Sequence, residues 1–134
     1  MKRKTEKQKI GRKGERIAAR YLRRQGCRIL ARNKNFGRNE LDLVVKQGRY
    51  IAFVEVKTRS FDSPEQADVR PCAAVDKQKR LRTVQAARDY MHEKPTALCP
   101  RFDVVEVYLN RSKRHKPFKI NHIPAAFLFD GTIH

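Results

Sequence analysis

Apolar residues recur at helical spacing near the start of the chain and at alternating or continuous spacing through much of its middle. The first pattern predicts an amphipathic helix over roughly residues 8–25, with Gly26 as its C-cap. Asp76 is a typical N-cap residue, and the apolar spacing after it predicts a second helix that runs to about Met91. Both predicted helices carry basic residues on the faces that lack apolar side chains.

Five segments have the pattern of strands, at residues 27–33, 41–46, 50–58, 102–109 and 118–123. Short turns separate the first three, which predicts an antiparallel meander. The second helix lies between residues 50–58 and 102–109, so a right-handed crossover makes these two strands parallel. The order is therefore α-β-β-β-α-β-β, and the predicted fold is a mixed α/β sheet.

Length and composition predict one domain that spans residues 1–134, since 40% hydrophobic residues suffice for a modest core. Residues 1–8 are predicted to be a disordered basic N-terminus, and residues 59–75 a long loop. No apolar run approaches the roughly 20 residues of a membrane span, and the basic start lacks the features of a secretory signal. The predicted location is the cytoplasm.

The three cysteines and four histidines show no ligand spacing and are assigned no role.

The charge balance indicates the kind of partner. Lys and Arg number 32 against 14 acidic residues, for a net charge of +18, which predicts a polyanion such as nucleic acid and no membrane. Residues 1–34 alone hold 14 Lys and Arg and two acids. A solvated helix face is the ordinary explanation of such a run, but the near absence of balancing acids favours a surface that faces phosphates. The candidates on the first helix are Arg12, Lys13, Arg16 and Arg20.

Charged residues interrupt the apolar strand sequence at two places. Glu40 and Asp42 lie at the start of the second strand, and Glu55 and Lys57 near the end of the third. Because residues two apart on a strand share a face, each pair projects together. Unpaired charge in such a setting costs several kcal/mol, so these residues are candidates for a functional site.

The turn between the two strands decides whether the two pairs meet. A two-residue turn at Gln47-Gly48 places Asp42 diagonal to Glu55, whereas one at Gly48-Arg49 places the two residues directly opposite. A three-residue loop with regular pairing would put Asp42 on the wrong face.

Carboxylates this close repel one another unless they share a proton or a cation. Their hard oxygen atoms suit Mg²⁺ or Mn²⁺, and the backbone carbonyl of Val56 is a further candidate ligand. Lys57 beside such a metal can orient or deprotonate a water, which predicts phosphodiester hydrolysis. The structural alternative is an ion pair in which Lys57 bridges Asp42 or Glu55.

Asp42 followed after thirteen residues by Glu55-x-Lys57, with Glu15 on the preceding helix, resembles the active-site signature of the PD-(D/E)XK nucleases, especially the archaeal Holliday-junction resolvases. From about residue 11 to 131 the chain resembles more closely the uncharacterised YraN family within that superfamily. The matching segments include Gly14-Glu15, Ile29-Leu30-Ala31-Arg32-Asn33, Glu40-Leu41-Asp42-Leu43, Phe53-Val54-Glu55-Val56-Lys57-Thr58-Arg59 and Arg101-Phe102-Asp103-Val104-Val105. One departure is Asn39, where the family more often has Gly.

The resemblance implies a restriction-endonuclease-like fold, a mixed central sheet flanked by helices, and an endonuclease that cuts branched or single-stranded DNA. Asp42 and Glu55 would then be metal ligands, Lys57 the group that positions water, and Glu15 an outer ligand acting through water. Spacing alone favours Glu15 as half of a surface ion pair with Arg12, and only the family resemblance makes it an equal candidate for the site. Glu40 is either a ligand at a second metal site or an edge-strand charge. Further candidates for phosphate contacts are Arg59, Lys77, Lys79 and Arg80.

Two functional classes remain open at this stage. One is a Mg²⁺- or Mn²⁺-dependent endonuclease, in which the carboxylates are needed for turnover. The other is a non-catalytic module that keeps the nuclease fold and binds structured RNA or DNA. An intact carboxylate set favours the enzyme, because carboxylates repel phosphates and give a pure binder no advantage. Relatives with this fold often pair to cut two strands, so a homodimer is a further expectation.

Overall fold

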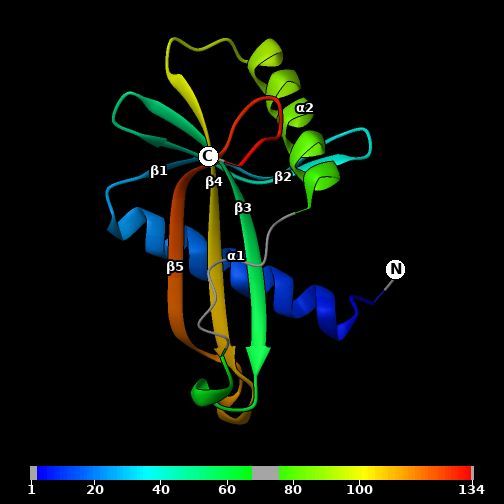
Figure 1. Cartoon of the computed structure of the whole chain (residues 1–134), viewed down its shortest axis with the longest axis vertical. Coiled ribbons are helices and arrows are strands. Elements are labelled where there is room, and N and C mark those ends of the chain that lie inside the picture. Colours follow the sequence, from blue (N-terminus) through cyan, green and yellow to red (C-terminus); the bar gives the residue numbers. More distant parts are fainter. Residues whose placement is uncertain (1–2, 68–75, 134) are drawn as a thin grey trace.

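The computed structural model describes residues 3–67 and 76–133, and within them two helices flank a five-stranded mixed sheet (Figure 1). In chain order the elements are α1 (Glu6–Arg24), β1 (Arg28–Phe36), β2 (Asn39–Gln47), β3 (Tyr50–Phe61), α2 (Lys77–Glu93), β4 (Cys99–Asn110) and β5 (Lys116–Phe127), with short 3-10 turns at Pro64–Gln66 and Arg111–Lys113. This is the predicted order α-β-β-β-α-β-β, so the predicted fold class is confirmed.

The strands follow one another across the sheet in the order β1-β2-β3-β4-β5. β3 and β4 are parallel and all other neighbours are antiparallel, as the crossover through α2 requires. Gln47 pairs with Tyr50, so β2 and β3 are joined by the two-residue turn Gly48-Arg49. Gly48 has a φ of 58°, the left-handed conformation that Gly adopts at the first central position of such turns. Of the predicted alternatives, this one places Asp42 opposite Glu55.

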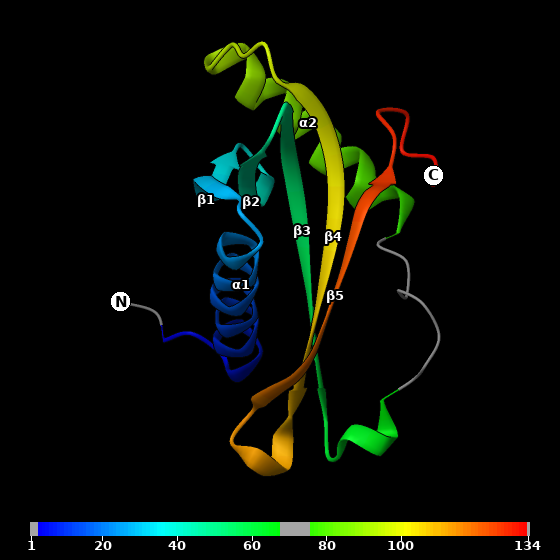
Figure 2. The same ribbon diagram turned by 90° about the vertical axis from the view of Figure 1, so that its left-hand side faces the viewer.

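The two helices pack on opposite faces of the sheet (Figure 2). Alternate residues of β3 serve the two layers: Phe53 packs with α2, whereas Ala52 and Val54 pack with α1. The apolar segment at the end of β5 belongs to the α2 layer, where Phe127 stacks on Phe102. None of the helices in the described ranges is long and apolar enough to cross a membrane.

Most element boundaries differ by a few residues from the predicted ones, including those of α1, β3 and β5. α1 begins at Glu6, so residues 6–8 are helical rather than disordered; Thr5 caps the helix in a reciprocal pair of hydrogen bonds with Gln8. β3 continues to Phe61, because it pairs with β4 along its whole length, and the predicted loop 59–75 is correspondingly shorter at its start. The rest of that loop, residues 68–75, lies outside the described residues. β5 runs from Lys116 to Phe127, longer than predicted at both ends.

Gly14 lets α1 approach β3 closely. A Cβ atom built on Gly14 would lie 1.8 Å from Oγ1 and 2.9 Å from Cβ of Thr58, distances that atoms cannot adopt. The next residue along the helix is Glu15, so the same close approach sets how near its carboxylate comes to the sheet.

Gly14→Ala is therefore expected to destabilise the protein by about 1–3 kcal/mol, although Ala is the better helix former. Urea unfolding of a double-mutant cycle with Thr58→Gly measures the contact, because Thr58→Gly removes the three atoms nearest to the added Cβ. In the Thr58→Gly background, Gly14→Ala should cost nothing. An equal loss in both backgrounds would mean that the clash is not the cause.

Candidate functional site

The site begins where β2 and β3 stop pairing. The last residue pair between the two strands is Leu43 with Val54. Beyond it, the N–H of Val56 bonds to a side chain of β2 rather than to its backbone. The carboxylate of Asp42 takes its place and accepts a hydrogen bond from the N–H of Val56 at 2.9 Å. This bond fixes Asp42 between the two strands and beside the segment that carries Glu55 and Lys57.

Three carboxylates gather on the α1 side of this point. One oxygen each of Glu15, Glu40 and Asp42 lies within 4.8 Å of the others. The guanidinium of Arg12 contacts Glu15 at 3.0 Å and Glu40 at 3.5 Å. Glu15 therefore does form the ion pair with Arg12 that its spacing suggested, and it also lies near Asp42. We call Glu15, Glu40, Asp42 and Glu55 the acidic cluster.

Glu55 lies on the other side of Asp42, in register on β3. It is 7% exposed, and its Oε1 lies 3.5 Å from Nζ of Lys79 on α2. The predicted structural alternative, an ion pair from Lys57 to Asp42 or Glu55, is not found among the described residues; Lys79 takes that place. The ammonium of Lys57 is exposed, and its charge nevertheless acts to lower the pKa of Glu55.

Burial and neighbouring negative charges raise the pKa values of the carboxyl groups in the acidic cluster. Burial raises the pKa of Asp42 to about 7, and the negative charge of Glu55 adds to the shift. Burial likewise raises the pKa of Glu55, against the opposing charge of Lys79 and a hydrogen bond with Asp42. The pKa of Glu15 is also raised, by burial and then by Asp42. These carboxyl groups are costly to ionise together, and a bound cation would lower that cost.

The predicted phosphate-contacting residues are spread over both helices. Of those on α1, Arg16 and Arg20 are exposed, and Lys13 donates to the backbone carbonyl of Arg114 at 3.1 Å. On α2, Lys79 contacts Glu55 and the Nε of Arg80 donates to the carbonyl of Gly131 at 2.6 Å. The remaining candidates are Arg12, in the acidic cluster, Arg59 on β3 and Lys77, which opens α2.

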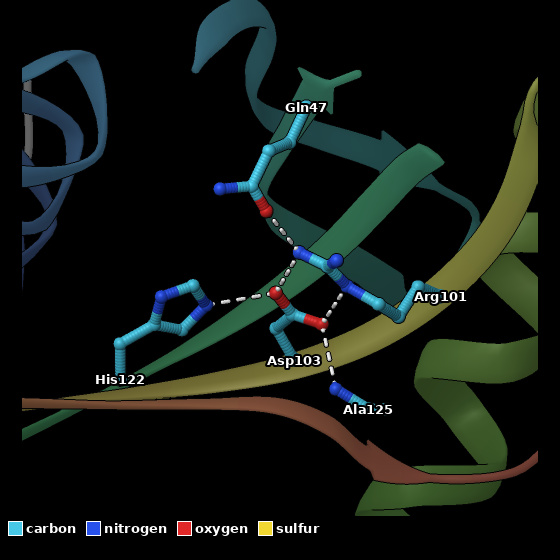
Figure 3. A network of polar contacts seen from close by, with 5 residues as sticks. All are labelled: Gln47, Arg101, Asp103, His122 and Ala125. Carbon is cyan, nitrogen blue, oxygen red and sulfur yellow. Dashed lines mark hydrogen bonds and ion pairs between the residues drawn. The ribbon is translucent and has the colours of Figure 1, made fainter. Parts of the chain in front are cut away.

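A second polar network lies farther along the same face of the sheet as α1 (Figure 3). Asp103 is fully buried on β4, and Arg101 donates to both its oxygens at 2.9 Å, while His122 lies 2.8 Å away and the N–H of Ala125 3.0 Å away. Burial acts to raise the pKa of Asp103, but these hydrogen bonds lower it overall. Both oxygens of Asp103 are partnered, so the network ties β5 to β4 and has a structural role. His122, predicted to be a bystander, belongs to it.

Sequence reasoning missed two residues near the acidic cluster. Lys79 was predicted to contact phosphate, but its contact with Glu55 follows only from how α2 crosses the sheet. Glu106 is the β4 neighbour of Lys57 and is fully buried; Asn121 donates to its Oε1 at 3.0 Å, and its Oε2 has no partner. The sequence did indicate Glu106 in one way, because it is an acidic residue among the apolar residues of a strand.

Comparison with known proteins identifies a family and distantly similar solved structures. The model of the family described as "Uncharacterised protein family UPF0102" matches residues 14–107. A UPF0102 protein of Solibacter usitatus is 47% identical over 110 residues, 78% of each chain, and one of Syntrophotalea carbinolica is 42% identical over 123 residues, 91% of this chain and 94% of that one. Among solved structures, Pyrococcus furiosus SfsA in complex with Ca²⁺ matches with a TM-score of 0.37 and 19% identity, over 86% of this chain and 62% of SfsA. The match to SfsA is too distant to support a functional argument.

Proposed function

The chain belongs to the UPF0102 family, and we propose that it is a divalent-metal-dependent endonuclease that hydrolyses phosphodiester bonds in DNA, with branched and single-stranded structures as its candidate substrates. The observation that carries the proposal is the acidic cluster. Glu15, Glu40 and Asp42 gather where the pairing of β2 with β3 ends, and Glu55, whose carboxylate interacts with Asp42, lies next to them on β3 with Lys57 two residues beyond it. They do so in a chain with a net charge of +18, which attracts a polyanion.

The donor set fits Mg²⁺ or Mn²⁺. All its side-chain donors are carboxylate oxygens, the ligands that these hard cations prefer, and burial raises the pKa values of Asp42 and Glu55, so a bound cation would offset the cost of ionising them. Asp42, Glu55 and Glu40 would hold the ion with the backbone carbonyl of Val56, and Glu15 would act through water. A bound divalent ion supplies a bound water of lowered pKa and offsets charge that develops on a phosphate.

The chain's own residues supply the other parts of the reaction. The ammonium of Lys57 is exposed beside Glu55, where it can hold a water and donate a hydrogen bond to a phosphate oxygen. Arg12 forms ion pairs with Glu15 and Glu40 at the edge of the cluster. Its guanidinium can therefore release these carboxylates and bind a phosphate instead. The basic residues of α1 and α2 lie on either side and would bind the backbone of the nucleic acid.

A non-catalytic binding module, for structured RNA or DNA, is the second candidate. One observation favours it: Arg12 and Lys79 already partner three of the four carboxylates, so the cluster is partly neutralised by the protein itself. Such a module needs the basic surface and not the carboxylates.

Purified protein incubated with labelled junction, flap, single-stranded and duplex DNA, and with structured RNA, distinguishes the two. The proposal predicts cleavage of at least one DNA substrate with Mg²⁺ or Mn²⁺ and none with EDTA, and binding that weakens steeply as salt rises. Asp42→Asn protein prepared in parallel controls for contaminating nucleases. Binding without cleavage of any substrate, or equal traces of cleavage in both proteins, would leave the binding module as the function.

A further inference from the structure

A pocket adjoins the acidic cluster on its α1 and β1 side. It has a volume of about 140 Å³ and is lined by Lys4, Arg12, Glu15, Arg16, Arg32, Asn33 and Leu43. The space is several times what one water needs. Glu15 belongs both to this pocket and to the acidic cluster, so a group bound here lies directly beside the proposed cleavage site.

The wall of the pocket is strongly basic and largely uncompensated. Four of its seven lining residues are cationic and one is acidic. Arg12 is paired with Glu15 and Glu40, whereas within residues 3–67 and 76–133 no ion pair involves Lys4, Arg16 or Arg32. Three exposed cations thus border a small, partly open pocket without a counter-charge, and their mutual repulsion favours an anionic ligand.

Asn33 supplies an independent sign of a ligand. Its Oδ1 is buried without a hydrogen-bond partner, and its backbone is left-handed, with a φ of 48°. Buried amides are normally satisfied, and left-handed conformations of residues other than Gly concentrate at binding sites. The β1–β2 pairing of Arg32 with Leu43 and of Lys34 with Leu41 sets Asn33 across from Asp42. Half a turn of the amide would present its NH₂ group to an anion in the pocket.

We propose that this pocket binds the terminal phosphate monoester of a nucleic-acid strand. A monoester carries between one and two negative charges and presents three acceptor oxygens, which matches several free cations better than a diester with one charge does. The assignment of a nucleic acid rests on the proposed function, but binding at the pocket requires no cleavage.

The test uses a short single-stranded oligonucleotide in three forms, with a 5′-phosphate, a 3′-phosphate or hydroxyl groups at both ends, in EDTA and at one salt concentration. Wild-type protein is expected to bind one phosphorylated form about tenfold more tightly than the hydroxyl form, the gain of one or two charge-assisted hydrogen bonds. Arg32→Gln should bring this ratio close to one. Arg28→Gln is the matched control, since Arg28 is exposed on the same strand and does not line the pocket; it should weaken all three forms alike and keep the ratio.

Equal affinities of wild-type protein for the three forms would overturn the proposal, as would a ratio that survives Arg32→Gln. A ratio that falls equally in Arg28→Gln protein would show general electrostatic attraction and also overturn it. Thermal unfolding of each variant checks that it is folded. Because EDTA prevents metal-dependent turnover, these outcomes are independent of whether the protein cleaves DNA.

Discussion

Asp42→Asn protein is expected to be more stable than wild-type protein at pH 8, by about 2–4 kcal/mol, and equally stable near pH 4. Burial raises the pKa of Asp42 from 3.8 to about 7 in the folded protein. Between these values the folded protein holds a proton that the unfolded chain has released, so the stability of wild-type protein falls as the pH rises from about 4 to 7. Above pH 7 the full penalty of the buried charge applies. Asn has no charge and keeps an oxygen that accepts from Val56.

Urea unfolding of both proteins at pH 4.5, 6 and 8, without divalent ions, measures the difference. Asp62→Asn is the matched control, because Asp62 is exposed and its pairing with Arg111 at the surface contributes at most about 1 kcal/mol. Its effect should not grow with pH. If Asp42→Asn instead destabilised the protein at pH 8, the carboxylate would be stabilised by its protein surroundings, and the case for a cation site would fail.

The second large effect is on turnover. Lys57→Ala is expected to lower metal-dependent cleavage by about 100-fold or more, the usual contribution of a group that positions or deprotonates a nucleophile. Its affinity for Mn²⁺ should be unchanged, since the ammonium of Lys57 is not a ligand. Asp42→Asn should lose both cleavage and Mn²⁺ affinity while gaining stability, so its loss of activity is not due to unfolding.

Cleavage rates at saturating Mn²⁺, with Mn²⁺ affinity measured separately, separate these two roles. Lys46→Ala is the matched control, because Lys46 is exposed on β2 away from the acidic cluster, and it should retain cleavage within about twofold. Cleavage by Lys57→Ala protein at the wild-type rate would remove Lys57 from the reaction. A loss of Mn²⁺ affinity in the same variant would assign Lys57 to the structure of the metal site.

The strand order was predictable because it depends on local signals, whereas the placement of Asp42 opposite Glu55 was one of the alternatives that these signals left open. The Gly48-Arg49 turn is short, its glycine suits a left-handed position, and the side-chain period of two then decides which residues face one another. The boundaries were less predictable. Residues 59–61 are polar and aromatic without a clear period, yet they extend β3 because β4 offers an unbroken row of partners.

The parts of the site that depend on helix packing could not be read from the spacing of residues. Glu15 joins Asp42 only because Gly14 lets α1 lie against Thr58, and spacing along the chain carries no information on that contact. Lys79 meets Glu55 because of the angle at which α2 crosses the sheet. Family resemblance supplied Glu15, but neither spacing nor resemblance identified the pocket around Arg32 and Asn33, whose residues come from separate elements.

The central claim is that the acidic cluster is a divalent-cation site, and titration calorimetry of Mn²⁺ into wild-type and Asp42→Asn protein tests it most directly. At pH 6.5, in buffers of different ionisation enthalpy, wild-type protein should bind Mn²⁺ saturably and release protons, because a ligand with a pKa of about 7 must deprotonate to bind. Asp42→Asn should bind at least tenfold more weakly and release fewer protons. Absence of saturable binding by wild-type protein, or equal affinity in the two proteins, would contradict the account.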